Sequence, residues 1–167
     1  MDLLERDTFA AEAVGPIVFA LWRGDLNGES VERVGALLHR TAQAHPGGIA
    51  FITVAEYRAP IPPAPIRARI VEIYGELGSQ LSGVAQVVEG TGFWASAALC
   101  FIAGVGLLNK HTHPMKVFGR TDAAIDWVGS LGVPQAHPLQ VVRARVAHRA
   151  RALDRATAGS AELLPSR

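Results

Sequence analysis

The chain has 167 residues, a length that fits one domain and leaves little room for a second. Hydrophobic residues make up 49% and charged residues 19%, which favours a packed core and excludes a chain that is disordered throughout. The 16 basic and 15 acidic residues give a formal net charge of +1, which argues against nucleic acid as a partner.

The cellular compartment is indicated by cysteine usage and by the first residues. Cys100 is the single cysteine and cannot form an internal disulfide, which is typical of a reducing compartment. Asp2, Glu5 and Asp7 precede any apolar run, unlike the basic start of an export signal. We therefore expect a cytoplasmic protein.

The first half of the chain predicts two buried strands and a helix between them. Ile17–Trp22 and Ile49–Ala55 are continuous apolar runs, as expected for strands covered on both faces. Phe9–Val14 can pair with the first run across a turn at Gly15, as an edge strand or an N-terminal arm. Asn27 can cap a helix that ends before Pro46.

The middle of the chain predicts a second helix and a third strand. Pro65 suits a first helical turn, and apolar residues then recur with a helical period over residues 66–81. A strand is expected over residues 84–88. Residues 93–108 carry no charge, but they are too few and too rich in glycine for a bilayer span. We predict a buried helix there, with membrane insertion as the minor alternative.

Residues after 114 complete the predicted sheet. Met115–Phe118 indicates a fourth strand, and Thr121 can cap a helix whose Ala124, Val128 and Leu131 face inward before Gly132 ends it. Alternating strands and helices predict an α/β fold, with four or five strands in a mostly parallel or mixed sheet. We assign residues 1–133 to this domain, with its core at residues 15–128.

Residues 134–167 are predicted to form a C-terminal basic helix and a flexible tail. Residues 139–167 hold six basic and two acidic residues, a balance of +4, whereas residues 1–138 hold ten and 13, a balance of −3. We expect fraying from residue 157. The helix can bind a protein partner or cover the sheet as an amphipathic layer. The candidate partner-binding residues are Arg143, Arg145, Arg149 and Arg151.

Few residues point to catalysis, a metal or a cofactor, and we predict none of the three. His111 and His113 are spaced as a metal pair could be, but a metal site needs three or four ligands. Cys100 lies in an apolar segment, which disfavours a reactive thiolate.

A weak candidate site for an anion lies where the third strand ends. A turn between a strand and a helix presents free backbone N–H groups. Arg67 and Arg69, at the start of the second helix, are expected at the same carboxyl end of the sheet. The turn residues are Gly90, Thr91 and Gly92.

Three stretches of residues 15–128 resemble the STAS family, the domains similar to anti-sigma-factor antagonists. They are residues 17–26, Ile49–Ala55 with the loop that follows, and residues 116–128. The resemblance implies an α/β domain that acts by docking to protein partners. The family's phosphoacceptor turn corresponds here to residues 55–60, which contain no serine or threonine. Glu56 is only a partial mimic of a phosphate, which puts phosphorylation switching at this position in doubt.

Two functions therefore remain open. The first is a non-catalytic interaction module that regulates a protein partner, with a homodimer as a further possibility. The second is a small-ligand or anion-binding protein, with an enzyme as one form of it, that uses the carboxyl end of the sheet. Binding at a membrane surface is a third and weaker hypothesis.

Overall fold

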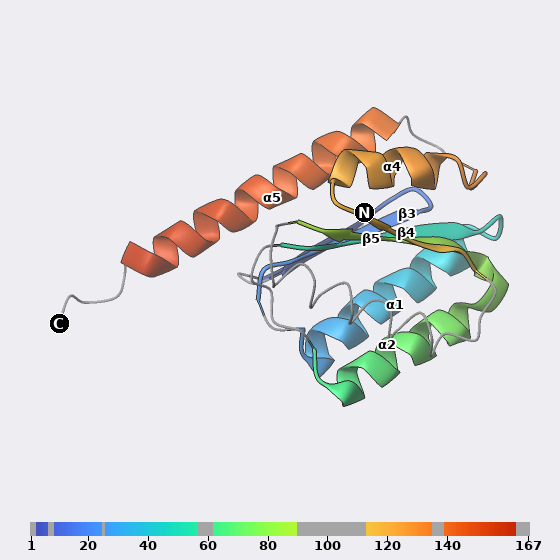
Figure 1. The fold of residues 1–167 in the computed structure, drawn as a ribbon, viewed down its shortest axis with the longest axis horizontal. Coiled ribbons are helices and arrows are strands. Elements are labelled where there is room, and N and C mark those ends of the chain that lie inside the picture. The colour runs from blue at the N-terminus through green and yellow to red at the C-terminus, as the bar shows by residue number, and fades with distance from the viewer. Residues whose placement is uncertain are drawn as a thin grey trace.

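A six-stranded sheet lies between two layers of helices (Figure 1). The computed structural model describes residues 3–6, 9–24, 26–56, 62–89, 113–134 and 139–162, with side chains from Phe9 to Arg155 within these ranges. The strands are β1 (Leu3–Arg6), β2 (Phe9–Val14), β3 (Ile17–Trp22), β4 (Ile49–Ala55), β5 (Leu81–Val88) and β6 (Met115–Phe118). The helices are α1 (Gly28–Ala44), α2 (Ala64–Leu77), η1 (Gly78–Gln80), α4 (Thr121–Gly129) and α5 (Leu139–Glu162).

The sheet is mixed, as predicted. β3, β4, β5 and β6 are parallel neighbours, whereas β1 and β2 and then β2 and β3 pair antiparallel. Gly15 has a φ of 57° in the tight turn between β2 and β3, a conformation that glycine adopts without strain. β1 was not predicted from the sequence, and its pairing with β2 places β2 inside the sheet instead of at its edge.

Each face of the sheet carries its own apolar core. On one face, Val18, Ala20 and Trp22 pack with residues of α1 and α2. On the other face, Phe19 and Leu21 pack with residues of α4 and α5. Because successive side chains of a strand point to opposite faces, the continuous apolar run of β3 is explained by helices on both sides (Figure 1).

Helix α1 begins where the sequence predicts. The Asn27 side chain accepts a hydrogen bond of 2.9 Å from the backbone N–H of Ser30, and the backbone N–H of Asn27 donates to the Ser30 hydroxyl at 3.2 Å. The two bonds form a reciprocal capping box that satisfies backbone donors left open at a helix start.

Replacing Asn27 with alanine is expected to lower the free energy of unfolding by about 1 kcal/mol, because the helix loses its side-chain acceptor. Urea unfolding followed by circular dichroism measures this loss. Asn27→Ser, which keeps an acceptor at the same position, should retain most of the stability. Equal losses in the two variants would show that the cap contributes nothing.

Three boundaries differ from the predicted ones. Helix α2 ends at Leu77, and Leu81 begins β5 instead of extending the helical stripe. Gly78, with a φ of 52°, breaks the helix there. Thr121 is the first residue of α4 and not its cap, because its hydroxyl donates to Glu89 and Arg120 occupies the cap position. Leu131 lies beyond the end of α4 at Gly129.

Helix α5 lies against the sheet and continues past the point where fraying is expected. Val142, Val146 and Leu153 are buried in the core that α5 shares with α4 and the sheet. The 24 residues of α5 extend to Glu162, about 36 Å at the rise of an α-helix, and its last turns project beyond the sheet (Figure 1).

Two further predictions concern the rest of the chain. The helix expected over residues 93–108 lies outside the described residues. Among the described helices, none combines the length and the apolar character that crossing a membrane requires. The domain boundary at residues 133/134 stays a prediction.

Candidate functional site

Charged residues follow the carboxyl ends of the four parallel strands. Arg23 follows β3, Glu56 follows β4, Glu89 follows β5, and Arg120 comes two residues after β6. We call these four residues the charged rim. The backbone N–H of Glu56 donates to Trp22 at 3.0 Å, and that of Glu89 donates to Ala55 at 3.1 Å. The rim therefore continues the hydrogen bonding of the sheet at the edge where open α/β sheets bind ligands.

Strand alternation brings the rim to the face covered by α4 and α5. Leu21 of β3, Val54 of β4 and Val87 of β5 all belong to the core on this face. Arg23, Glu56 and Glu89 each come two residues later, so the two-residue period of a strand continues onto the same side. Contacts with α4 and α5 confirm this placement.

Arg23 connects two strand ends to helix α5. Its guanidinium forms an ion pair with Glu56, and Nη2 lies 2.8 Å from Oδ1 of Asp154. Nη2 also donates to the backbone carbonyl of Ala150 at 3.3 Å. The side chains of Arg23 and Glu56 are only 16% and 18% exposed. Burial lowers the pKa of the Arg23 guanidinium, but the two carboxylates outweigh burial and raise it above its ordinary value.

The ion pair with Arg23 changes the role that can be assigned to Glu56. The family resemblance places this residue near the phosphoacceptor turn, where its charge could imitate a phosphate. In the structure that charge faces Arg23 and is largely shielded from solvent. Glu56 therefore links β4 to β3 and is poorly placed to offer its charge to a partner.

Glu89 and Arg120 border a pocket of about 470 Å³ between α4 and α5. The Thr121 hydroxyl donates to Oε1 of Glu89 at 2.9 Å, which joins the end of β5 to the start of α4. The residues that line the pocket are Glu89, Gly119, Arg120, Thr121, Asp122, Ile125, Arg143, Val146, Ala147 and Ala150.

The predicted anion-site residues that are described do not join this rim. Nη1 of Arg67 donates to the backbone carbonyl of Pro62 at 3.2 Å, beside the start of α2. Arg69 binds Glu32 of α1 and both Glu72 and Glu76 of its own helix. Gly90, Thr91 and Gly92 lie outside the described residues. The anion site stays a prediction, and Arg69 already has three carboxylate partners.

The ion pairs of Arg69 shift the pKa values of the residues involved. We call Arg69, Glu32, Glu72, Glu76 and His39 the Arg69 cluster. Hydrogen bonds from Arg69 lower the pKa of Glu32 and that of Glu76, and His39 lowers the pKa of Glu76 further. The hydrogen bonds from Glu32 and Glu76 in turn raise the pKa of Arg69. These side chains are partly exposed to solvent, so the cluster ties α1 to α2 at the surface.

Two of the predicted partner-binding arginines point inward, toward Glu12 of β2. Nε of Arg145 lies 2.7 Å from Oε1 of Glu12, and Nε of Arg149 lies 2.8 Å from Oε2. Glu12 is 1% exposed and the Arg149 side chain is 9% exposed. Arg143 pairs with Asp126 and lies 3.4 Å from Asp122 of α4.

Arg151 is exposed. The proposed role of these arginines in partner binding stays a prediction, but at least two of them hold α5 on the sheet.

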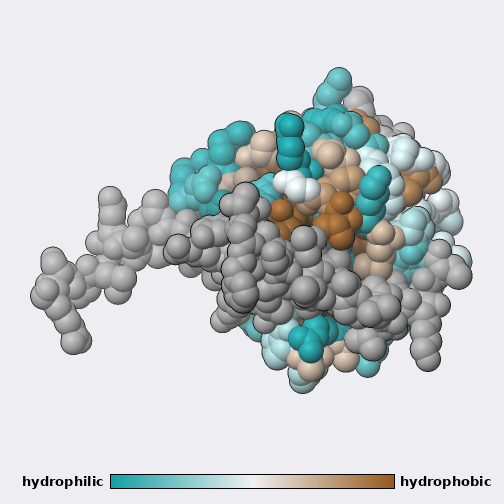
Figure 2. All heavy atoms as spheres, viewed as in Figure 1, coloured by the Kyte–Doolittle hydropathy of each residue, from teal (hydrophilic) through white to brown (hydrophobic). Residues whose placement is uncertain are grey.

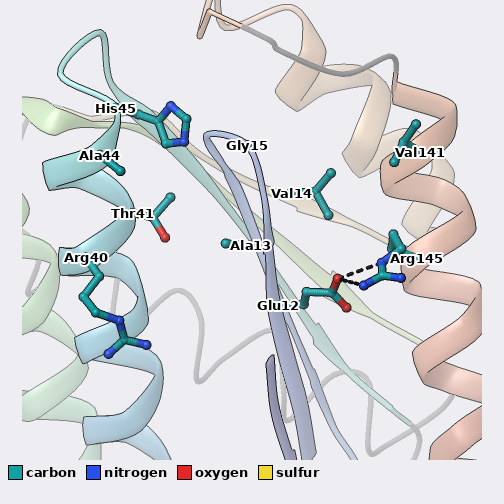
Figure 3. Close-up of a pocket in the computed structure, with 10 residues that line it drawn as sticks. All are labelled: Glu12, Ala13, Val14, Gly15, Arg40, Thr41, Ala44, His45, Val141 and Arg145. Atoms are coloured by element: carbon teal, nitrogen blue, oxygen red, sulfur yellow. Dashed lines mark hydrogen bonds and ion pairs between the residues drawn. The ribbon is translucent and has the colours of Figure 1, made fainter. Parts of the chain in front are cut away.

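A second pocket, of about 520 Å³, surrounds the turn between β2 and β3. Figure 3 shows Arg40 and Thr41 of α1 on one side of this turn and the Glu12–Arg145 pair on the other. The turn joins the carboxyl end of β2 to the amino end of β3, so the second pocket lies at the opposite edge of the parallel strands from the charged rim. No site is predicted at this turn from the sequence.

Sequence reasoning missed Glu12 and most of the rim, although a signal was present. Glu12 is the one charged residue in the otherwise apolar strand β2, and a lone carboxylate in a buried strand needs a partner. A charged residue after each parallel strand is a repeated pattern that could have indicated the rim. Within the described residues, no three side chains of the metal-binding types gather in one place.

No family model matches this chain, and no curated protein matches it.

In fold, the chain is similar to two solved structures. One is an uncharacterized protein from the DUF3478 family with a SpoIIAA-like fold, from Shewanella loihica PV-4. It is 15% identical, the match covers 72% of this chain and 94% of that one, and the TM-score is 0.47. The other is an anti-sigma factor antagonist from Mycobacterium paratuberculosis. It is 12% identical, with 75% and 97% covered and a TM-score of 0.46. At these values neither structure assigns a function or a partner to this chain.

Proposed function

We propose that the chain is a non-catalytic interaction module that regulates a protein partner, and that this partner binds the outward face of α5. One stripe of exposed residues runs along that face at helical spacing, and we call it the outer α5 stripe. It consists of Val141, Ala144, His148, Arg151 and Arg155.

The observation that carries the proposal is the division of charge on α5. Arg145 and Arg149 face inward and bind Glu12, whereas Arg151 and Arg155 are exposed on the outer stripe. Among the described residues, no carboxylate pairs with either of these two outward arginines. Exposed cations on a helix attract an acidic surface and set the orientation in which it docks. Val141, 38% exposed, adds an apolar contact at the other end of the stripe.

The proposal keeps one of the four arginines predicted from sequence and replaces the others. Arg151 stays, and Arg155 joins it. Arg143, Arg145 and Arg149 are assigned a different role, since their ion pairs attach α5 to α4 and to β2. The partner is accordingly a protein with an acidic groove or patch that accepts a helix.

Reversing the charge of the outer stripe is expected to abolish partner binding without changing the fold. The full chain and its Arg151→Glu/Arg155→Glu variant are used to retain proteins from the lysate of the organism that makes the chain. Arg33→Glu, a charge reversal at another exposed position, on α1, is the control. A protein retained by the wild type and the control, but reduced more than tenfold by the double variant, supports the proposal. Equal retention by all three chains contradicts it.

Small-ligand binding at the charged rim is a second candidate function. The pocket of about 470 Å³ between α4 and α5 favours it, because this size falls in the range of small-molecule sites, about 300–1,000 Å³. Neither Arg151 nor Arg155 lines this pocket, so the two functions use different surfaces of α5.

A further inference from the structure

The pocket at the charged rim is lined by buried apolar side chains, which form its floor, and by charged side chains that are more exposed. Ile125 of α4 and Val146 and Ala150 of α5 are the aliphatic side chains that line it. Gly119 and Ala147 line it as well, and their small size leaves the space between the two helices open. A ligand in this pocket can therefore place an apolar group against the helices and its polar groups toward the rim.

Two of the four charged residues that line the pocket, Arg143 and Asp122, form an ion pair with each other. Nε of Arg143 lies 3.4 Å from Oδ1 of Asp122, and Asp126 also pairs with this arginine. Their charges compensate within the protein. The charges that a ligand can meet are therefore those of Arg120 and Glu89.

Arg120 and Glu89 carry opposite charges at the same pocket. Arg120 is exposed and pairs with no carboxylate of the described residues. Glu89 accepts the Thr121 hydroxyl on Oε1, and no described donor reaches its other oxygen. The pocket thus offers one cation and one carboxylate oxygen above an apolar floor.

We propose that this pocket binds a small zwitterion with an apolar side chain, that is, an α-amino acid or a short peptide. Its carboxylate meets the Arg120 guanidinium, its ammonium group meets Glu89, and its side chain covers Ile125 and Val146. A phosphate dianion fits less well, because the carboxylate of Glu89 repels it. A purely apolar ligand would desolvate two charges without pairing them. The inference rests on the second candidate function.

The test compares four ligands that differ by one group at a time. Isothermal titration calorimetry on the full chain uses L-leucine, L-leucyl-L-leucine, N-acetyl-L-leucine and L-leucinamide. The acetyl compound lacks the ammonium charge, and the amide lacks the carboxylate. We expect each loss to weaken binding about tenfold or more, since each removes a charged hydrogen bond. Preference for leucine or for the dipeptide then identifies the source of the zwitterion.

Variants of the protein locate the site. Ala147→Phe fills the pocket from an exposed position of α5 and should abolish binding, whereas Ala144→Phe, also at an exposed position but outside the lining, should not. Arg120→Ala should weaken L-leucine but leave L-leucinamide unchanged. Glu89→Gln keeps an acceptor for Thr121 and should weaken L-leucine but leave N-acetyl-L-leucine unchanged.

The outcomes separate the ligand class from the candidate function. If L-leucine and the dipeptide bind no better than the two singly charged analogues, and Ala147→Phe still removes that binding, the zwitterion is wrong and small-ligand binding stands. If none of the four ligands binds at about 10 mM, a concentration that would reveal even a millimolar dissociation constant, the inference is overturned. If Ala147→Phe leaves binding unchanged, the assignment of the ligand to the pocket between α4 and α5 is wrong.

Discussion

Glu12→Ala is expected to lower the free energy of unfolding by about 3–5 kcal/mol, one of the largest effects that a single substitution can have in this chain. The side chain is 1% exposed and accepts hydrogen bonds from Arg145 and Arg149. Its removal leaves the Arg149 guanidinium buried without its carboxylate, and the desolvation cost of that charge is then no longer offset. Chemical denaturation of the wild type and the variant measures the difference.

A second variant distinguishes charge from packing. If the loss comes from the uncompensated cation, Glu12→Leu combined with Arg149→Leu should recover most of it, because replacing a buried pair by apolar residues is often neutral. Arg145 remains partly exposed and can be solvated. Glu29→Ala, on the exposed start of α1, is the control and should change the free energy by less than about 0.5 kcal/mol. A loss below about 1 kcal/mol in Glu12→Ala would contradict this account.

Leu153→Ala is expected to cost about 2–5 kcal/mol, because it opens a cavity under α5. Leu153 is 1% exposed and packs in the core between α5 and the sheet. It lies next to Asp154, through which Arg23 connects the helix to the charged rim. We therefore expect the variant also to increase hydrogen exchange in the second half of α5 more than in α1. Thermal denaturation and hydrogen exchange read by mass spectrometry measure the two effects.

The matched control for this variant is Val141→Ala on the same helix. Val141 is 38% exposed, so its truncation removes little buried surface and should change the stability by less than about 0.5 kcal/mol. Should the two variants lose stability equally, α5 would not be packed on the sheet through Leu153. Exchange that rises uniformly over the whole chain would show global unfolding instead of local release of the helix.

Together these predictions assign two roles to one helix. The inward face of α5 covers an apolar sheet face and neutralises Glu12, whereas the outward stripe is proposed to bind a partner. A chain that ends at Pro138 would lose both roles, so a failure of that chain to bind a partner would say nothing about the outer stripe. Charge reversals at Arg151 and Arg155 avoid this difficulty, because both side chains are exposed.

The elements that sequence predicts well are those specified by near neighbours along the chain. The apolar runs of β3 and β4, the Asn27 cap and the helical spacing of α1 all depend on residues a few positions apart. The boundary between α2 and β5 was misplaced because Leu81 fits a helical stripe and a strand equally well, and the conformation of Gly78 decides between them. β1 was missed because its four residues, two leucines followed by a glutamate and an arginine, are few and do not alternate between apolar and polar side chains.

What the sequence by itself determined is the α/β class, the order of most elements and the basic helix at the C-terminus. The tertiary structure alone decided which of the basic residues on that helix form ion pairs with carboxylates of the chain. Glu12 and Arg145 are 133 positions apart, and Arg23 and Glu56 are 33 apart. Such ion pairs depend on how strands and helices stack in space. The local pattern of residues contains no information on that stacking, because the sequence neighbours of a charged residue do not identify the distant residue with which it will pair.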